Sequence, residues 1–263
     1  QESMFKILKY TFYDIIRSRW RLAYFFFYLI LGFVLLFLNN DISKALITLM
    51  NIVLVLTPLI GTIFGVMYYY SSIDFTKLLL AQPIKRSKIF LGQYLGVVSS
   101  LTLSLVFGLG IPFIIYGLSV SSAIFDFILL LISASFLNLI FVALAYIISL
   151  YNENKIKGFG YSILIWLFLA IIYDGLFLIL LVFFNEYPLD KLSLLAITLN
   201  PIDLSRILIL LKLDISALLG YTGAMFKQFF GTSQGVFYSS LILIIWTLIP
   251  LSVIISTSNK KDF

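Results

Sequence analysis

The side chains that most enzymes and metalloproteins use are missing from this sequence. It contains no cysteine and no histidine, which excludes disulfide bonds, zinc fingers, iron–sulfur clusters, histidine-ligated haem and a Ser-His-Asp triad. Its four methionines supply a thioether copper path poorly. The phosphate-loop pattern GxxxxGK followed by Ser or Thr does not occur in the chain. We therefore expect no catalytic residue, metal site or cofactor in this chain, and no ATP hydrolysis by it.

One stretch between two apolar runs, residues 73–88, combines an amphipathic pattern, a proline and a basic cluster. A short helix should run to about Ala81, because Pro83 disfavours helix at Gln82 and forces a turn. A compact helix with a rigid turn suits force transmission, and its apolar ridge could fit a groove on a partner. An ordinary interfacial loop explains the pattern equally well. The candidate coupling residues are Asp74, Leu78, Leu79, Leu80, Gln82, Pro83, Lys85 and Arg86.

Asp174 is a charged residue inside a long apolar run. A charge at the bilayer centre costs about 2.5–3.5 kcal/mol on insertion scales, so something must offset it. Asp174 could be a gate or pathway residue, or it could be hydrated or hydrogen-bonded by Tyr173 or a neighbouring helix. It lies about 16 residues after Gly158, or roughly 24 Å at the helical rise. This depth places it toward the outer leaflet and favours the second interpretation somewhat.

The composition identifies the setting in which these residues must work. Hydrophobic residues make up 62% of the 263 residues, charged residues 11%, and the mean hydropathy is +1.10. Soluble domains have about 45–50% apolar and about 25% charged residues. So few charges cannot cover a water-facing surface, and we predict an integral membrane protein rather than a soluble enzyme, a disordered tail or a coiled coil.

Apolar stretches long enough to cross a bilayer occur six times, since a span needs about 20 mostly apolar residues, and Asp174 is the one charge within them. The runs are apolar on all sides and lack the alternation of a β-barrel, so an all-α fold is predicted. Gly61/Gly65 and Gly92/Gly96 have GxxxG spacing, which we attribute to ordinary close packing of helices. The predicted spans lie within residues 22–40, 45–73, 89–125, 127–152, 158–185 and 228–259.

The positive residues predict the orientation, because cytoplasmic loops are rich in Lys and Arg. The opposite side has Lys44 and, in one long segment, Lys191, Arg206, Lys212 and Lys227. Both termini should therefore be cytoplasmic. The side with more positive residues carries Lys6, Lys9, Arg17, Arg19, Arg21, Lys77, Lys85, Arg86, Lys88, Lys155, Lys157, Lys260 and Lys261.

Two further segments lie outside the spans. Residues 4–21 are too charged to cross, and an apolar side (Phe5, Leu8, Phe12, Ile15, Ile16) predicts an amphipathic helix in the plane of the interface. Residues 186–227 predict an extracytoplasmic segment of short helices, with Pro201 in a first helical turn and a turn near residues 220–223. An apolar element there needs a partner: the bundle, the lipid surface or another protein.

The stretch Leu79–Arg86, followed by Leu91–Gly96, resembles the coupling helix of permease subunits of export-type ABC transporters. Six spans after an amphipathic helix fit this layout, and many relatives have an acidic residue where this chain has Lys77. The outer segment resembles most closely the permease of the NosDFY transporter, which assists maturation of nitrous oxide reductase in denitrification. The residues that carry this resemblance, and which it implies as contacts for an extracytoplasmic partner, include Asn200, Pro201, Asp203, Arg206, Gly220, Tyr221 and Gly223.

The resemblance implies one transmembrane permease domain over residues 1–263 in the bacterial cytoplasmic (inner) membrane. It implies a homodimer, a cytoplasmic ABC ATPase dimer that binds ATP and Mg, and an extracytoplasmic β-helical accessory protein. The implied role is copper-site or sulfur delivery to nitrous oxide reductase, with metal binding left to partners. No nucleic-acid partner is expected.

Other functions remain open at this point. A general exporter permease for lipid, polysaccharide or peptide uses the same scaffold. An ATP-independent carrier would predict inverted repeats, broken helices or several intramembrane charges, of which only Asp174 is found. An intramembrane enzyme would need paired acids or a Ser-Lys dyad within the spans. Two mechanisms fit an ABC permease: the dimer opens a pathway for a small cargo, or it moves the outer protein mechanically.

Overall fold

The computed structural model describes residues 2–39, 41–118, 121, 123–184, 190–212 and 220–260, and regular structure in this part of the chain is entirely helical. Six helices in it are long and apolar enough to cross a membrane. This confirms the predicted all-α membrane fold with six spans. The spans are α2 (Arg19–Asn39), α3 (Ile42–Ser71), α5 (Arg86–Ile115), α6 (Ile124–Tyr151), Lys155–Leu180 within α7–α8, and Gln234–Lys260 within α11.

The bundle is built around α3, α5 and α6. The most extensive pairing joins α3 to α6, α2 packs along α5, and α11 packs against α6. Gly61 and Gly65 let α3 approach α6 closely, because a Cβ on Gly65 would lie 2.9 Å from the Ala145 Cβ. The first GxxxG pair therefore serves packing within the chain, as its spacing suggested.

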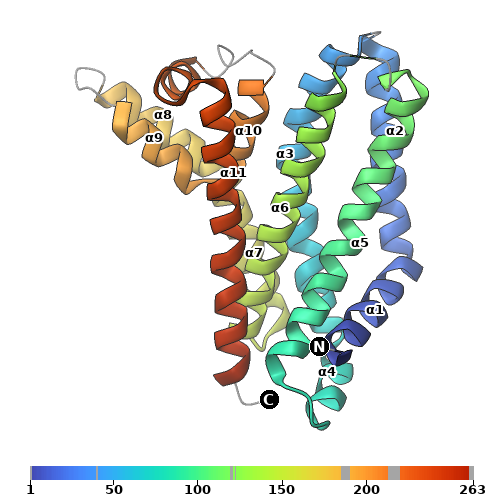
Figure 1. Ribbon diagram of the computed structural model, residues 1–263. Helices are drawn as coiled ribbons and strands as arrows, with labels where there is room; N and C mark the ends of the chain where they lie inside the picture. Colours follow the sequence, from blue (N-terminus) through green and yellow to red (C-terminus); the bar gives the residue numbers. More distant parts are fainter. Residues whose placement is uncertain are drawn as a thin grey trace.

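The bundle has two distinct ends (Figure 1). One end, which we call the basal end, holds the start of α1 (Glu2–Arg17), the short helix α4 (Ile73–Leu80) and the end of α11 (Gly220–Lys260). The other, which we call the outer end, holds α8 (Tyr173–Phe183), α9 (Asp190–Leu199) and α10 (Pro201–Lys212).

The N-terminal helix differs in two ways from its prediction. It ends at Arg17, and Arg19 already belongs to α2, whose Arg21 amide donates to the Ser18 hydroxyl over 3.3 Å. Its buried side consists of Ile7, Thr11 and Ile15. Of these three residues, only Ile15 belongs to the predicted apolar side. The reason is that this side packs on α5 rather than on lipid.

The fifth span is interrupted. Between α7 (Lys155–Leu167) and α8, residues Phe168–Ile172 form a π-helical turn. No proline or glycine occupies this turn, so it was not visible in the sequence. Such turns are rare in helices and leave a backbone carbonyl without its regular partner.

The helices of the outer segment begin where their capping residues allow. Asn200 accepts a hydrogen bond from the Ile202 amide over 3.1 Å, and Pro201 opens α10, as expected. The turn expected near residues 220–223 is not found, because α11 begins at Gly220. Glycine is tolerated in the helices of membrane proteins, so it marks turns there less reliably than in soluble chains.

Candidate functional site

The coupling stretch forms the helix and turn that its sequence predicted. Helix α4 ends at Leu80, and the next turn is held by the Ile84 amide donating to the Gln82 carbonyl over 2.7 Å. Pro83 lies in this turn and cannot donate, which ends the helix. Asp74, Gln82, Pro83 and Lys85 are exposed, and Arg86 is half-buried.

The structure separates the three leucines of the predicted apolar ridge. Leu78 is 68% exposed, whereas Leu79 is 9% exposed and packs with Ile7 and Ile89. Leu80 is half-buried against the same cluster. Leu78 therefore offers most of its side chain to a partner and Leu80 offers a part, whereas Leu79 attaches α4 to the bundle.

Two further contacts hold α4, and the sequence did not reveal either. The buried Gln93 amide of α5 donates to the Thr76 hydroxyl over 2.8 Å. The ring of Tyr10 in α1 stacks on Phe75, with centroids 4.6 Å apart and planes at 27°. Because both pairs join residues far apart in the sequence, no local spacing could have found them.

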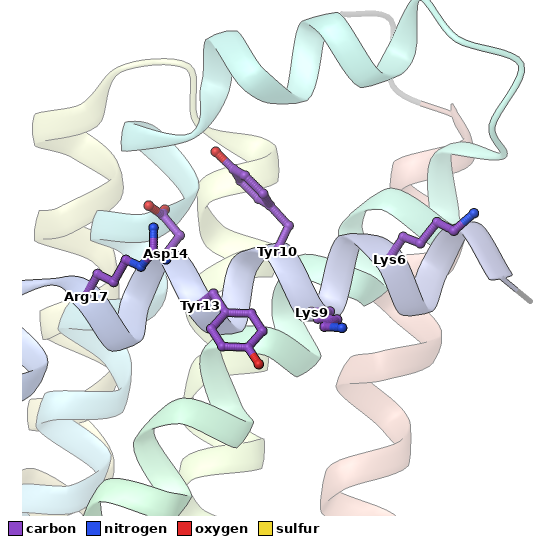
Figure 2. A pocket seen from close by; sticks show the side chains of 6 residues that line it. All are labelled: Lys6, Lys9, Tyr10, Tyr13, Asp14 and Arg17. Atoms are coloured by element: carbon purple, nitrogen blue, oxygen red, sulfur yellow. The ribbon is translucent and has the colours of Figure 1, made fainter.

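Helix α1 extends this basal surface. A pocket of about 510 Å³ lies along α1. Figure 2 shows the side chains that line it, with Tyr10 and Tyr13 pointing to opposite sides of the helix. A second pocket of about 260 Å³ lies beside α4. Positive side chains line both, so the basal end presents a basic, partly aromatic surface. The first is lined by Lys6, Lys9, Tyr10, Tyr13, Asp14 and Arg17, and the second by Lys77, Leu80, Ala81 and Arg86.

At the outer end, Asp174 is joined to the segment predicted to contact a partner. One Arg206 nitrogen (Nη1) lies 3.2 Å from Asp174 Oδ2 and 2.9 Å from Asp203 Oδ1. Asn200 donates to Asp203 Oδ2 over 2.8 Å. The Asp174 carboxylate is thus paired with a residue 32 positions away, which the sequence analysis named as a positive loop residue and a partner contact but not as the partner of Asp174.

The environment of Asp203 disfavours its charge. Burial, and then the neighbouring Asp174 carboxylate, raise the pKa of the Asp203 carboxyl, while Arg206 and Asn200 act in the opposite direction. One arginine cannot fully neutralise two carboxylates in a partly buried position. These surroundings therefore favour the protonated form of Asp203.

The residues predicted as outer contacts fall into two groups. Asn200, Pro201, Asp203 and Arg206 lie on α9–α10, and in this chain they are buried or half-buried against the bundle. Gly220, Tyr221 and Gly223 lie in the first turn of α11, where the side chains lie outside the described part of the structure. Partner contact by either group stays a prediction.

Within the described ranges, no three His, Cys, Asp or Glu side chains come together as a metal site would require. Asp174 and Asp203 are paired with Arg206 instead.

Comparison with known proteins finds similarity to ABC transporter permeases. "Probable ABC transporter permease protein NosY" of Stutzerimonas stutzeri is 26% identical over 219 residues, which cover 74% of this chain and 76% of that protein. The protein of the same name from Pseudomonas aeruginosa is 30% identical over 145 residues, or 53% of each chain. No protein-family model matches the chain.

The six apolar spans make the chain a multi-pass membrane protein, and these relatives show that it is similar to permease proteins of ABC transporters. The predicted resemblance to a NosY-like ABC transporter permease is confirmed.

Proposed function

We propose that this chain is the membrane subunit of an ABC transporter that couples ATP hydrolysis below the membrane to an accessory protein above it. Its role would be copper-site or sulfur delivery during maturation of nitrous oxide reductase. The observation that carries this proposal is the similarity to NosY over three quarters of the chain. The ATPase partner would supply the phosphate loop and bind ATP and Mg.

The charge distribution supports a cytoplasmic basal end. Lys6, Lys9 and Arg17 of α1 and Lys77 and Lys85 around α4 are exposed there. Positive residues favour the cytoplasmic side of a bacterial inner membrane. Both ends of the chain would then lie in the cytoplasm, with α8–α10 outside.

The exposed side of α4 is the proposed contact for the ATPase. It combines Leu78 with Asp74, Lys77, Gln82 and Lys85, which suits a groove with an apolar floor and charged rims. Through the buried contacts of Leu79 and Thr76, a movement of α4 caused by the ATPase would be transmitted to α1 and α5.

Leu78→Asp tests this contact directly. We expect it to abolish co-purification with a co-expressed candidate ABC ATPase while leaving insertion and thermal stability unchanged. Ile156→Asp is the matched control, because Ile156 is also exposed at the basal end but lies at the start of α7. Leu79→Asp should destabilise the protein itself. Normal ATPase recovery with Leu78→Asp would refute the assignment.

A second copy of the chain would complete the membrane domain. In the apolar stretch of the α7–α8 span, 11% is buried within the chain, whereas 56% of the corresponding stretch is buried in α5 and in α6. This span also carries Asp174, whose side chain is 34% exposed. A partly exposed carboxylate is unfavourable against lipid, and closed two-fold pairing is the commonest solution for oligomers. The homodimer would have twelve spans.

The alternative is a general exporter permease for lipid, polysaccharide or peptide. Native mass spectrometry of the chain co-expressed with its genomic neighbours separates the two. Two copies of each subunit plus an extracytoplasmic protein are expected here. Two copies of each without that protein would favour the general exporter, and recovery without an ATPase would favour an ATP-independent carrier.

A further inference from the structure

The two irregular points of the outer backbone lie against each other. The π-helical turn Phe168–Ile172 interrupts the fifth span, and α9 and α10 meet at Asn200-Pro201 with a bend of 112°. The fully buried Asn200 side chain joins them, because its amide nitrogen donates to the Leu169 carbonyl over 2.8 Å. Asn200 thus satisfies a carbonyl of the π turn and caps α10 with the same side chain.

An ion pair adds a second link between these elements. Arg206 of α10 reaches Asp174 of α8, just after the π turn. The Arg206 and Asp174 side chains are 22% and 34% exposed. In such a setting, removing one partner leaves the other charge poorly compensated, so the link resists separation.

Two more side chains fix α9 between the last two spans. The Tyr173 hydroxyl of α8 donates to the Ala196 carbonyl over 2.6 Å. The Trp246 indole of α11 donates to the Thr198 carbonyl over 2.9 Å. The α9–α10 pair is therefore bonded to the spans on both sides and does not form a separate outer domain.

We propose that Asn200 and Arg206 are positioning residues that clamp α9–α10 to the outer half of the fifth span, so that the two move as one body. We call Asn200, Asp203, Arg206 and Asp174 the outer clamp. Its role as a transmission element rests on the proposed function: a movement of α8 would reach an accessory protein through α9–α10. The contacts of the clamp lie within a single chain, so they do not depend on any partner protein.

The clamp also selects the helical register of α8. If the π turn became regular α-helix, α8 would turn by about 100° relative to α7 and shift by about 1.5 Å. Asp174 would then leave Arg206, and the Leu169 carbonyl would leave Asn200. The two contacts therefore oppose that change together, and removing either should free it.

The first experiment measures the clamp in the permease alone. The chain lacks cysteine, so one pair of cysteines can be introduced and spin-labelled, at Leu178 of α8 and Leu195 of α9. Both residues are exposed, and the experiment measures the distance between the two labels. In nanodiscs without nucleotide, we expect one narrow distance distribution. Arg206→Met and Asn200→Leu should each broaden it or add a second population, and Arg206→Lys should partly restore it. The matched control is Lys44→Met, an exposed basic residue outside the clamp.

A narrow, unshifted distribution in both Arg206→Met and Asn200→Leu would overturn the proposal. Broadening in Lys44→Met as well would also overturn it, because the change would then be general loosening. Thermal unfolding of every labelled variant identifies any that fail to fold. Asp174→Asn, which keeps the side-chain shape, tests the same ion pair with Arg206 from the side of α8.

The second experiment adds the partner ATPase and a non-hydrolysable ATP analogue. We expect the Leu178–Leu195 distance to stay constant while Leu195 moves relative to a label at Ile114, an exposed residue of α5. A change between Leu178 and Leu195 would refute movement as one body. Failure of the ATPase to bind would contradict the proposed function instead, and the first experiment would still decide the clamp.

Discussion

Replacing Gly96 by alanine should separate α1 from the bundle. A Cβ at this position would lie 2.6 Å from the Cβ and Cγ2 of Thr11 and 3.0 Å from the Leu8 carbonyl oxygen. Thr11 is fully buried, and the Leu8 carbonyl belongs to the helix backbone. Neither neighbour is the free end of a flexible side chain, so α1 itself has to move.

The size of the effect follows from two opposing contributions. Forcing an extra carbon into a packed contact costs about 1–3 kcal/mol. Alanine is favoured over glycine inside a helix by up to about 1 kcal/mol. Gly110 is the matched control, because it lies in the same helix and a Cβ added there would meet nothing within 4 Å. Gly96→Ala and Gly110→Ala share the helix-propensity gain, so they should differ by the packing cost of about 1–3 kcal/mol.

Thermal unfolding in detergent measures the difference. For a chain of this size, about 2–4 °C corresponds to 1 kcal/mol, so Gly96→Ala should unfold about 2–12 °C below Gly110→Ala. One scan rate must be used throughout, because unfolding of large proteins is commonly irreversible. A second readout is cross-linking between Tyr10→Cys and Phe75→Cys by a short reagent, which should weaken only with Gly96→Ala. Equal stability and equal cross-linking of both alanine variants would refute the reasoning.

Three further predictions concern other parts of the chain. Tyr28→Phe removes a buried hydrogen bond of 2.8 Å to a hydroxyl of α3 and should cost about 0.5–1.5 kcal/mol in thermal unfolding, with the exposed Tyr116→Phe as a near-neutral control. Gly158→Ala collides with a tyrosine ring of α3, whereas Gly160→Ala meets nothing within 4 Å, so only the first should lower the melting temperature. Asp203→Asn should flatten the pH dependence of stability. Because the folded pKa of Asp203 is raised, its contribution is present at acidic pH and is lost as the pH rises through that pKa; an unchanged pH profile would contradict this.

Apolar runs predicted the spans well, because a bilayer requires about 20 apolar residues whatever the neighbouring helices are. They did not predict which face a helix buries. Thr11 lies on the buried side of α1 because a glycine of α5 leaves room for it, and nothing near Thr11 in the sequence shows this. In the same way, a run of three leucines looks uniform, although the helical turn of about 100° per residue directs Leu78 outward and Leu79 inward.

The chemistry at the outer end was only half visible in the sequence. Asp174 was recognisable because it interrupts an apolar run, and the cost of burying a charge indicated that a partner must exist. Arg206 could not be chosen as that partner, because the pairing depends on the bend at Pro201 and on the π turn. The start of α10 at Pro201 was visible in the sequence, but the 112° angle of the bend and the π turn were not.

The support of α4 by two other helices bears on how this protein could be re-engineered. Residues 73–88 look like a portable module, since a short loop carries the whole exposed face. Its underside, however, is shaped by Tyr10 and Ile7 of α1 and by Gln93 of α5. A chimera that exchanged the loop alone would bring the exposed residues that recognise a new partner, but not the contacts with α1 and α5 that hold α4 in place. Exchange of α1, the loop and the first turns of α5 together is the smallest graft that keeps the arrangement whole.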